Sequence, residues 1–273
     1  MTYTTVLVHL DGGQTNEPVL AIAASLAARY SARVIGIAAC QPMQIGVGGG
    51  DFTGGLAVLE RDIVDNELKR AEVEFRACAE IQPFVLEWRS CETLEPVSHI
   101  VAKEARCADL IITSLCSGAS RNALTHADTG DLVIRAGRPV LVVPAKPAQS
   151  SFETVVIAWA DTRECRRAVV DAMPILERAE RVLIVEVAPE LSEARSRTKD
   201  VVAWLSRHKI TADQLLVPAK GNHVASLALI ASEHGADLIV AGAYGHNRLR
   251  EWAFGGVTRD ILLRLDICAL LSH

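Results

Sequence analysis

Residues 236–260 read ADLIVAGAYGHNRLREWAFGGVTRD and carry the most informative pattern in this chain. An apolar stretch typical of a buried strand ends at Gly242, a loop passes through Gly245, and a helix is expected to begin at Gly255 and Gly256. Glycine lets a backbone approach a ligand closely, and the free N–H groups of a helix start favour negative charge. The stretch therefore predicts a phosphate cradle at the end of a buried strand.

The strand that opens this stretch has a counterpart earlier in the chain, because ADLIVAG at 236–242 repeats ADLIITS at 108–114. Other apolar strands recur in the same order in each half. Internal repetition of this kind indicates two copies of one supersecondary unit. The matching strands are 4–10 and 154–159, 33–39 and 181–187, 108–114 and 236–242, and 138–144 and 267–272.

Segments with helical spacing separate these strands, and a further strand is expected in each half at 84–88 and 214–218. Alternation of strands and helices predicts a parallel sheet with right-handed crossovers. Residues 145–151 have the composition of a linker. The expected fold class is α/β, with two tandem five-stranded, doubly wound, Rossmann-like domains at 1–147 and 152–273. The expected helices are 18–30, 56–78, 97–106, 131–136, 165–179 and 224–234.

Composition excludes several function classes. The net charge is −5, whereas binding to nucleic acid or an anionic membrane surface normally needs a basic face. No apolar run reaches membrane length, and the first residues lack the pattern of a signal peptide. The seven cysteines are scattered without a C-x-x-C pair, and no metal-binding spacing is present. We expect a cytoplasmic protein with reduced thiols, no metal and no membrane or nucleic-acid partner.

The glycines of residues 242–256, followed by Val257 and Thr258, resemble the signature of the universal stress protein family, and the whole chain resembles a tandem member. This resemblance implies a doubly wound α/β fold that binds ATP or a related adenine nucleotide at the carboxyl ends of the parallel strands. It also implies that an aspartate after the first strand meets the adenosine end. Residues after the second strand lie near the base, and the glycine loop holds the ribose and phosphates.

Each half matches the family pattern only in part. In the first half Asp11 matches the aspartate, but Ser114 and Ser117 stand where glycines are expected, and Asp131 at a helix start would repel phosphate. In the second half the glycines are kept and Ala160 replaces the aspartate. The resemblance therefore implies one site, in the second half, with phosphate binding better supported than adenine recognition. Its residues are Val187, Ala241, Gly242, Gly245, Gly255, Gly256, Val257 and Thr258.

Several alternatives remain open at this point. The glycines also fit a bare scaffold, in which case the chain is a ligand-independent interaction module, or the cradle takes another small anion. No catalytic triad or nucleophile motif is present, so we expect no enzyme, with weak ATP hydrolysis as the alternative. The glycine-rich residues 45–55 are expected as a mobile surface loop. The resemblance also implies that the last strands, 138–144 and 267–272, pair within the chain as a pseudo-dimer, and a further homodimer or a protein partner stays open.

Overall fold

The chain of 273 residues is described as a computed structural model. The structure describes residues 2–12, 15–42, 53–81, 85–115, 124–147, 150–219, 223–243 and 267–273. Within the helices it describes the backbone alone for residues 53–61, 79–81 and 223–224.

The strands form one sheet in the order β3-β2-β1-β4-β5-β10-β9-β6-β7-β8. In the first half these strands are β1 (Thr5–His9), β2 (Arg33–Cys40), β3 (Leu86–Glu92), β4 (Leu110–Ser114) and β5 (Val140–Val143). The second half contributes β6 (Thr154–Ala158), β7 (Arg181–Ala188), β8 (Ala212–Pro218), β9 (Leu238–Gly242) and β10 (Cys268–Ser272).

Neighbouring strands run parallel within each half, whereas β5 and β10 pair antiparallel, with Leu141 opposite Leu270. The expected pairing of these two strands within the chain is thus confirmed. It joins the two halves into a continuous sheet across a pseudo-twofold axis.

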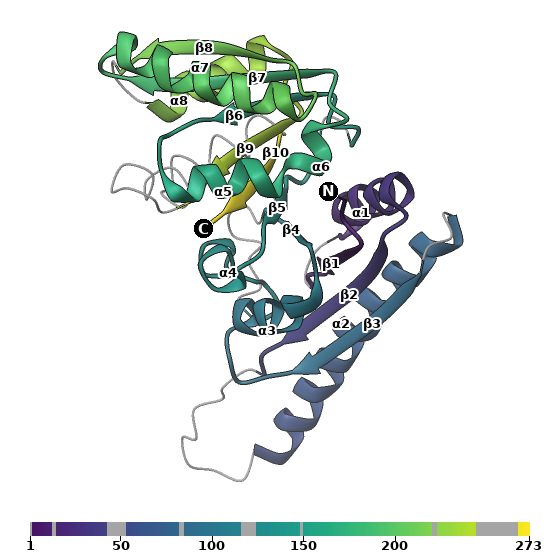
Figure 1. Ribbon diagram of the computed structural model, residues 1–273. Coiled ribbons are helices and arrows are strands. Elements are labelled where there is room, and N and C mark those ends of the chain that lie inside the picture. Colours follow the sequence, from purple (N-terminus) through teal and green to yellow (C-terminus); the bar gives the residue numbers. More distant parts are fainter. Residues whose placement is uncertain are drawn as a thin grey trace.

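Helices cover both faces of the sheet, which confirms the expected α/β fold (Figure 1). One apolar core lies under α1 (Glu17–Tyr30), α2 (Thr53–Ile81), α5 (Arg163–Asp171), α6 (Met173–Leu176) and α7 (Leu191–Arg207). A second core lies on the opposite face under α3 (Val97–Glu104), α4 (Thr129–Ala136) and α8 (His223–Glu233). Strands buried on both faces explain the nearly continuous apolar runs in the sequence.

The aspartate of the repeated ADLI motif accepts hydrogen bonds from main-chain N–H groups at the start of each half. Asp109 accepts hydrogen bonds from the backbone N–H groups of Thr4 and Thr5 at 2.7 and 3.0 Å. Asp237 accepts from the N–H groups of residues 153–154 at 2.8 and 3.2 Å. In both halves the carboxylate satisfies donors at the beginning of the central strand, so these aspartates are structural.

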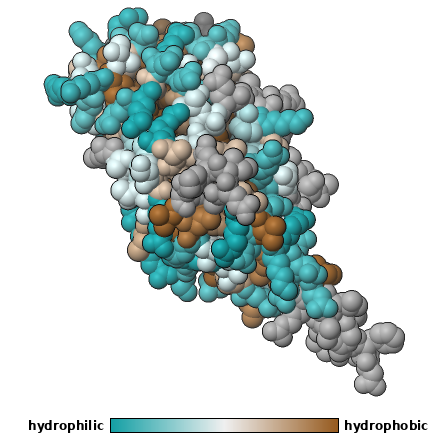
Figure 2. Space-filling model, turned by 90° about the vertical axis from the view of Figure 1, so that its right-hand side faces the viewer, coloured by the Kyte–Doolittle hydropathy of each residue, from teal (hydrophilic) through white to brown (hydrophobic). Residues whose placement is uncertain are grey.

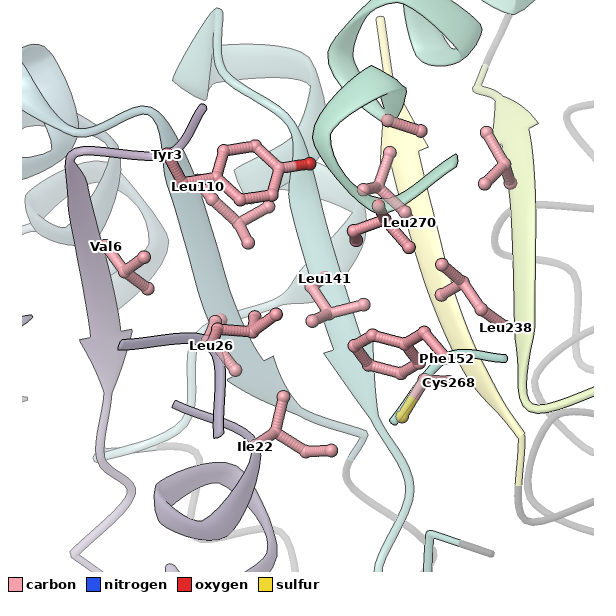
Figure 3. Packing of buried hydrophobic residues seen from close by; sticks show 14 of the residues in the cluster. Tyr3, Val6, Ile22, Leu26, Leu110, Leu141, Phe152, Leu238, Cys268 and Leu270 are labelled. Carbon is pink, nitrogen blue, oxygen red and sulfur yellow. The ribbon is translucent and has the colours of Figure 1, made fainter. Parts of the chain in front are cut away.

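Side chains from both halves meet over the seam between β5 and β10 (Figure 3). Phe152 is fully buried there beside Leu141 and Leu238, in the segment that leads into β6. The Tyr3 hydroxyl donates a 2.7 Å hydrogen bond to the carbonyl oxygen of Asp171 in the other half. The seam is therefore part of the apolar core rather than a polar contact between separate bodies.

Two expectations about local structure were wrong, and one helix was missed. The helix expected at 165–179 ends at Asp171 and begins again at Met173, with Pro174 in the first turn of the second piece. The strand expected at 84–88 lies at Leu86–Glu92, where polar side chains alternate as suits a strand at the edge of the sheet. Helix α7 was not anticipated at all, because charged residues dominate its sequence.

Polar side chains cover most of the face seen from the right-hand side of Figure 1, with apolar groups gathered in small patches across its middle (Figure 2). Of the helices that the structure describes, none combines the length and apolar content needed to cross a bilayer.

Candidate functional site

The carboxyl ends of β9, β6 and β7 lie side by side in the second half, because these strands are parallel neighbours. Ala241 and Gly242 end β9, and Val187 lies near the end of β7. The structure thus brings three of the predicted site residues to one edge, with Trp159 and Ala160 following β6 between them. The other five lie outside the described residues: Gly245, Gly255, Gly256, Val257 and Thr258.

Ala241 and Val187 have packing roles at this edge. Ala241 is fully buried and pairs in register with Ala158 and Leu271. Val187 is half-buried and pairs with Val217 on β8. Packing within the sheet explains both apolar side chains without a ligand. Both residues are nevertheless close enough to the carboxyl edge of the sheet to contact a ligand bound there.

Gly242 lies directly against the first turn of α5. A Cβ atom at this position would lie 2.3 Å from the backbone nitrogen of Cys165 and 2.6 Å from the carbonyl carbon of Glu164. Real Cβ contacts below 3.0 Å are essentially absent from proteins, and both contacted atoms belong to backbone that cannot swing aside. Helix packing alone therefore requires a glycine at position 242.

The first half tolerates a serine at the matching position because its first helix begins later. Ser114 ends β4 as Gly242 ends β9. Residues 10–16 connect β1 to α1, whereas only residues 159–162 connect β6 to α5. The shorter connection places the start of α5 closer to the strand ends, which accounts for the contact with Gly242.

In the second half, the position where the resemblance led us to expect an aspartate is Ala160, which has no carboxylate. The side chain of Asp161 is half exposed and pairs with Arg166 of α5 at 2.6 Å. The backbone N–H of Ala160 donates to the buried Cys165 sulfur at 3.4 Å. Burial raises the pKa of the Cys165 thiol to about 11, so this thiol is protonated and unsuited to act as a nucleophile.

In the first half the matching aspartate is enclosed by protein side chains. Asp11 is fully buried, and its carboxylate accepts a 2.6 Å hydrogen bond from the Thr125 hydroxyl. The Nδ1 atom of His126 lies 3.2 Å from the other carboxylate oxygen. Asn16 exchanges hydrogen bonds with the Asp11 backbone at 2.8 and 3.1 Å. Asp11 thus anchors the segment after β4 and is not presented to a ligand.

A buried histidine lies beside this carboxylate. His9 has no exposed surface, and its Nδ1 atom lies 3.1 Å from the Thr113 hydroxyl. Burial lowers the pKa of His9 to about 4, although the nearby negative charge of Asp11 acts in the opposite direction. His9 is therefore neutral at physiological pH.

Acidic side chains occupy the start of α4, the helix that follows β4 in the first half. Asp128 caps the helix by accepting a 2.9 Å hydrogen bond from the Asp131 backbone nitrogen. Burial acts to raise the pKa of Asp131, but hydrogen bonds from Ser98 and Arg135, each 2.6 Å long, hold it below its usual value. An ionised carboxylate therefore stands where a phosphate would meet the helix start.

Comparison with solved structures shows how widely this arrangement is shared. A universal stress protein from Archaeoglobus fulgidus matches with a TM-score of 0.71 and 11% identity, over 99% of this chain and 96% of that chain. The chain has the fold of universal stress proteins. A functionally unknown protein from Pseudomonas aeruginosa also matches, with a TM-score of 0.59 and 14% identity, over 99% of this chain and 92% of that chain.

No protein-family model matches the sequence, and neither does any curated protein. The shared universal stress fold therefore rests on the arrangement of strands and helices along the whole chain. At such low identity it says nothing about which ligand this chain binds.

Sequence reasoning missed two features of this region. The enclosure of Asp11 depends on Thr125 and His126, more than a hundred positions away, and no local pattern marks them. A pocket beside Trp159 depends on α7, which was not anticipated. Within the described residues, no group of three or more histidine, cysteine, aspartate or glutamate side chains is arranged to hold a metal ion.

Proposed function

We propose that this chain is a tandem universal stress protein, with domains at 1–147 and 152–273 and one nucleotide site in the second domain. The ligand is ATP or a related adenine nucleotide. The observation that carries the proposal is the glycine spacing of residues 242–256 directly after β9, a central strand whose carboxyl end lies where an open α/β sheet places its ligands.

The difference between the two halves supports a single site. In the first half Thr125 and His126 enclose Asp11, and carboxylates occupy the start of α4. In the second half, β9 reaches the same edge and ends there with Ala241 and Gly242. The glycines Gly245, Gly255 and Gly256 follow in the sequence. Repulsion and lack of space disfavour phosphate in the first half, whereas glycines and backbone donors favour it in the second.

The proposed mechanism is regulation coupled to binding. The phosphates of the nucleotide order the residues after β9, and a protein partner then recognises the altered surface. No catalytic step is proposed, and the site of action is the cytoplasm. The thiol of Cys165, buried and protonated, offers no alternative chemistry at the edge.

Calorimetric titration with ATP, ADP and AMP tests this function. We expect ATP to release or absorb measurable heat, Gly245→Val to abolish it, and the first-half variant Ser114→Gly to leave it unchanged. Gly242→Val is unsuitable as a test, because it would disturb the packing of α5. Absence of heat at millimolar nucleotide, with an unchanged circular dichroism spectrum, would refute the nucleotide site.

A second candidate, a ligand-independent interaction module, is favoured by one observation: the packing of α5 explains Gly242 without any ligand. Absence of binding by every nucleotide and by inorganic pyrophosphate supports it. Heat with pyrophosphate that matches the heat with ATP indicates an anion site without adenine recognition. Phosphate release from ATP that survives Gly245→Val would show hydrolysis unrelated to the glycine loop.

A further inference from the structure

We propose that the groove between α1 and α2 in the first half is the contact surface for a second copy of this chain, with the two α1 helices antiparallel. The groove has a volume of about 1060 Å³, at the upper limit for small-molecule sites, which usually measure about 300–1,000 Å³. It belongs to the first half, whereas the proposed nucleotide site belongs to the second, so the inference goes beyond that site and does not depend on it.

Small side chains form much of the α1 wall of this groove. Ala21 and Ala28 are exposed on the helix, and Ser25 is half-buried between them. A surface helix usually presents charged or polar side chains to water. Helix α5, the counterpart of α1 in the second half, follows this rule with the exposed residues Arg163 and Arg167. The surface of α1 is instead typical of a helix that packs against another helix, because small side chains let two helix axes approach to about 8 Å.

The wall formed by α2 also offers apolar surface. Ala77 is exposed there, and Val73, one turn earlier on the same side of the helix, is 67% exposed. Glu74, the charged residue of this wall, already accepts a 2.8 Å hydrogen bond from Asn16 and lies 3.5 Å from Arg70. A helix with small side chains therefore finds apolar surface on both sides of the groove, and α1 of a second copy is such a helix.

Two opposite charges at the ends of the α1 wall identify the partner. Glu17 lies in the first turn and Arg29 in the last turn, about 18 Å apart along the helix. Within the described part of the chain neither forms an ion pair, and Arg29 donates to the neutral carbonyl oxygen of Ser151. Ala21 and Ser25 lie between them, each four positions from the nearer charge. A twofold axis midway between Ala21 and Ser25 therefore places Glu17 of each copy beside Arg29 of the other, and it sets the two helix dipoles antiparallel.

This self-complementary pattern favours a second copy over other occupants. A small apolar ligand would leave Glu17 and Arg29 unpaired, whereas the twofold arrangement forms both ion pairs at once. Contact between two pairs of helices is at the low end of interface sizes, below about 1,200 Å² in total, which is typical of weak and transient association. We therefore expect a homodimer with a Kd on the order of 10 μM.

Sedimentation equilibrium of the full chain, between about 1 and 300 μM, tests the proposal. We expect the mass to rise from one chain towards two across this range. Glu17→Arg should weaken the dimer at least tenfold, because each copy then places two positive charges together, and Arg29→Glu should do the same with negative charges. Exchange of both charges, in the double variant Glu17→Arg/Arg29→Glu, should restore the Kd to within about threefold of the unchanged chain.

A steric variant tests the close approach of the helices independently of charge. Ala21→Trp places a large ring at the centre of the contact and should abolish the dimer. Leu229→Trp is its control, because Leu229 is 59% exposed on α8, which covers the opposite face of the sheet. Circular dichroism and thermal unfolding show whether each variant is folded. Because Arg29→Glu also removes the hydrogen bond to Ser151, the recovery in the double variant decides the role of the charges.

Three results would overturn the proposal. One is a chain that stays monomeric at about 300 μM, which would leave the groove to a different occupant. Another is a dimer that persists in folded Ala21→Trp, which would place the contact elsewhere. The third is a folded double variant that associates as weakly as the single charge variants. None of these results bears on the nucleotide titration or on the Gly245 variant, so the two proposals fail independently.

Discussion

Replacement of Gly242 by alanine tests whether helix packing, rather than a ligand, requires this glycine. The added Cβ would lie 2.3 Å from the backbone nitrogen of Cys165, so β9 and α5 must separate by roughly an ångström to reach an ordinary contact. Strand β9 cannot move easily, because β6 and β10 flank it. The first turn of α5 is held by the Thr162 cap, which accepts from the Cys165 nitrogen at 3.2 Å.

The free-energy cost of Gly242→Ala follows from the fixed position of β9 and from the cap that holds the start of α5. Overpacking in a core typically costs about 1–3 kcal/mol, and here the displaced atoms are backbone, which places the value at the upper end. Loss of the Thr162 cap adds about 1 kcal/mol if the helix start moves away. We therefore expect Gly242→Ala to lower the free energy of unfolding by about 3–4 kcal/mol, a large part of the stability of an ordinary domain.

The assay is urea unfolding followed by circular dichroism at 25 °C, with Gly137→Ala as the matched control. Gly137 ends α4 with φ of +57°, and an added Cβ there meets no atom within 4 Å. Alanine at that position costs only the left-handed backbone, about 1–2 kcal/mol. If Gly242→Ala destabilises the chain no more than Gly137→Ala does, the packing argument is wrong and a ligand again becomes the better reason for the glycine.

Three further outcomes are expected in the first half and at the seam. Because the pKa of His9 is about 4 when folded, the unfolded chain binds more protons between pH 6.5 and 4, so the free energy of unfolding should fall by up to about 3 kcal/mol as pH drops through this window. His9→Asn should flatten that dependence in urea titrations, and the exposed His208→Gln should not. Asp11→Ala should lower the free energy of unfolding by about 3 kcal/mol, because it leaves the buried Thr125 hydroxyl without its acceptor. The calorimetric affinity for ATP should not change in this variant. A weaker affinity would contradict the structural role of Asp11. Phe152→Ala should lower the free energy of unfolding by about 3–5 kcal/mol in the same assay. A decrease below about 1 kcal/mol would show that the seam is not packed as described.

Much of the sheet could be predicted from sequence because its strands are buried on both faces. Their apolar runs and the repeated ADLI motif predicted which segments form strands and the division into two halves, whereas the pairing of β5 with β10 was implied by the family resemblance. Elements with less apolar surface were harder. Helix α7 buries only Ala194, Thr198 and Leu205 among its described side chains and is otherwise rich in charged residues, so its sequence contains few apolar residues that would mark a helix packed on a sheet. Strand β3 lies at the edge of the sheet, where polar residues extend it beyond its apolar part.

The candidate site was harder to predict because its decisive contacts join distant parts of the chain. A glycine pattern indicates where the backbone comes close to something, but it does not tell whether that is a phosphate or a helix. The length difference between the connections at 10–16 and 159–162 was the visible signal for Gly242. The enclosure of Asp11 by Thr125 had no comparable signal, since the two residues are 114 positions apart.

The space beyond the carboxyl ends of the central strands β1 and β6 is occupied by different groups in the two halves. After β1 a long connection leaves space, and Thr125 and His126 occupy it by bonding Asp11. After β6 a short connection brings α5 forward, so the helix start takes the space beside Gly242. Neither end presents an unpaired carboxylate, because Asp11 bonds Thr125 and Asp161 pairs with Arg166. Any nucleotide affinity must then come from the glycines beyond Gly242, and for that reason Gly245→Val separates phosphate binding from scaffold packing more cleanly than any substitution within β9.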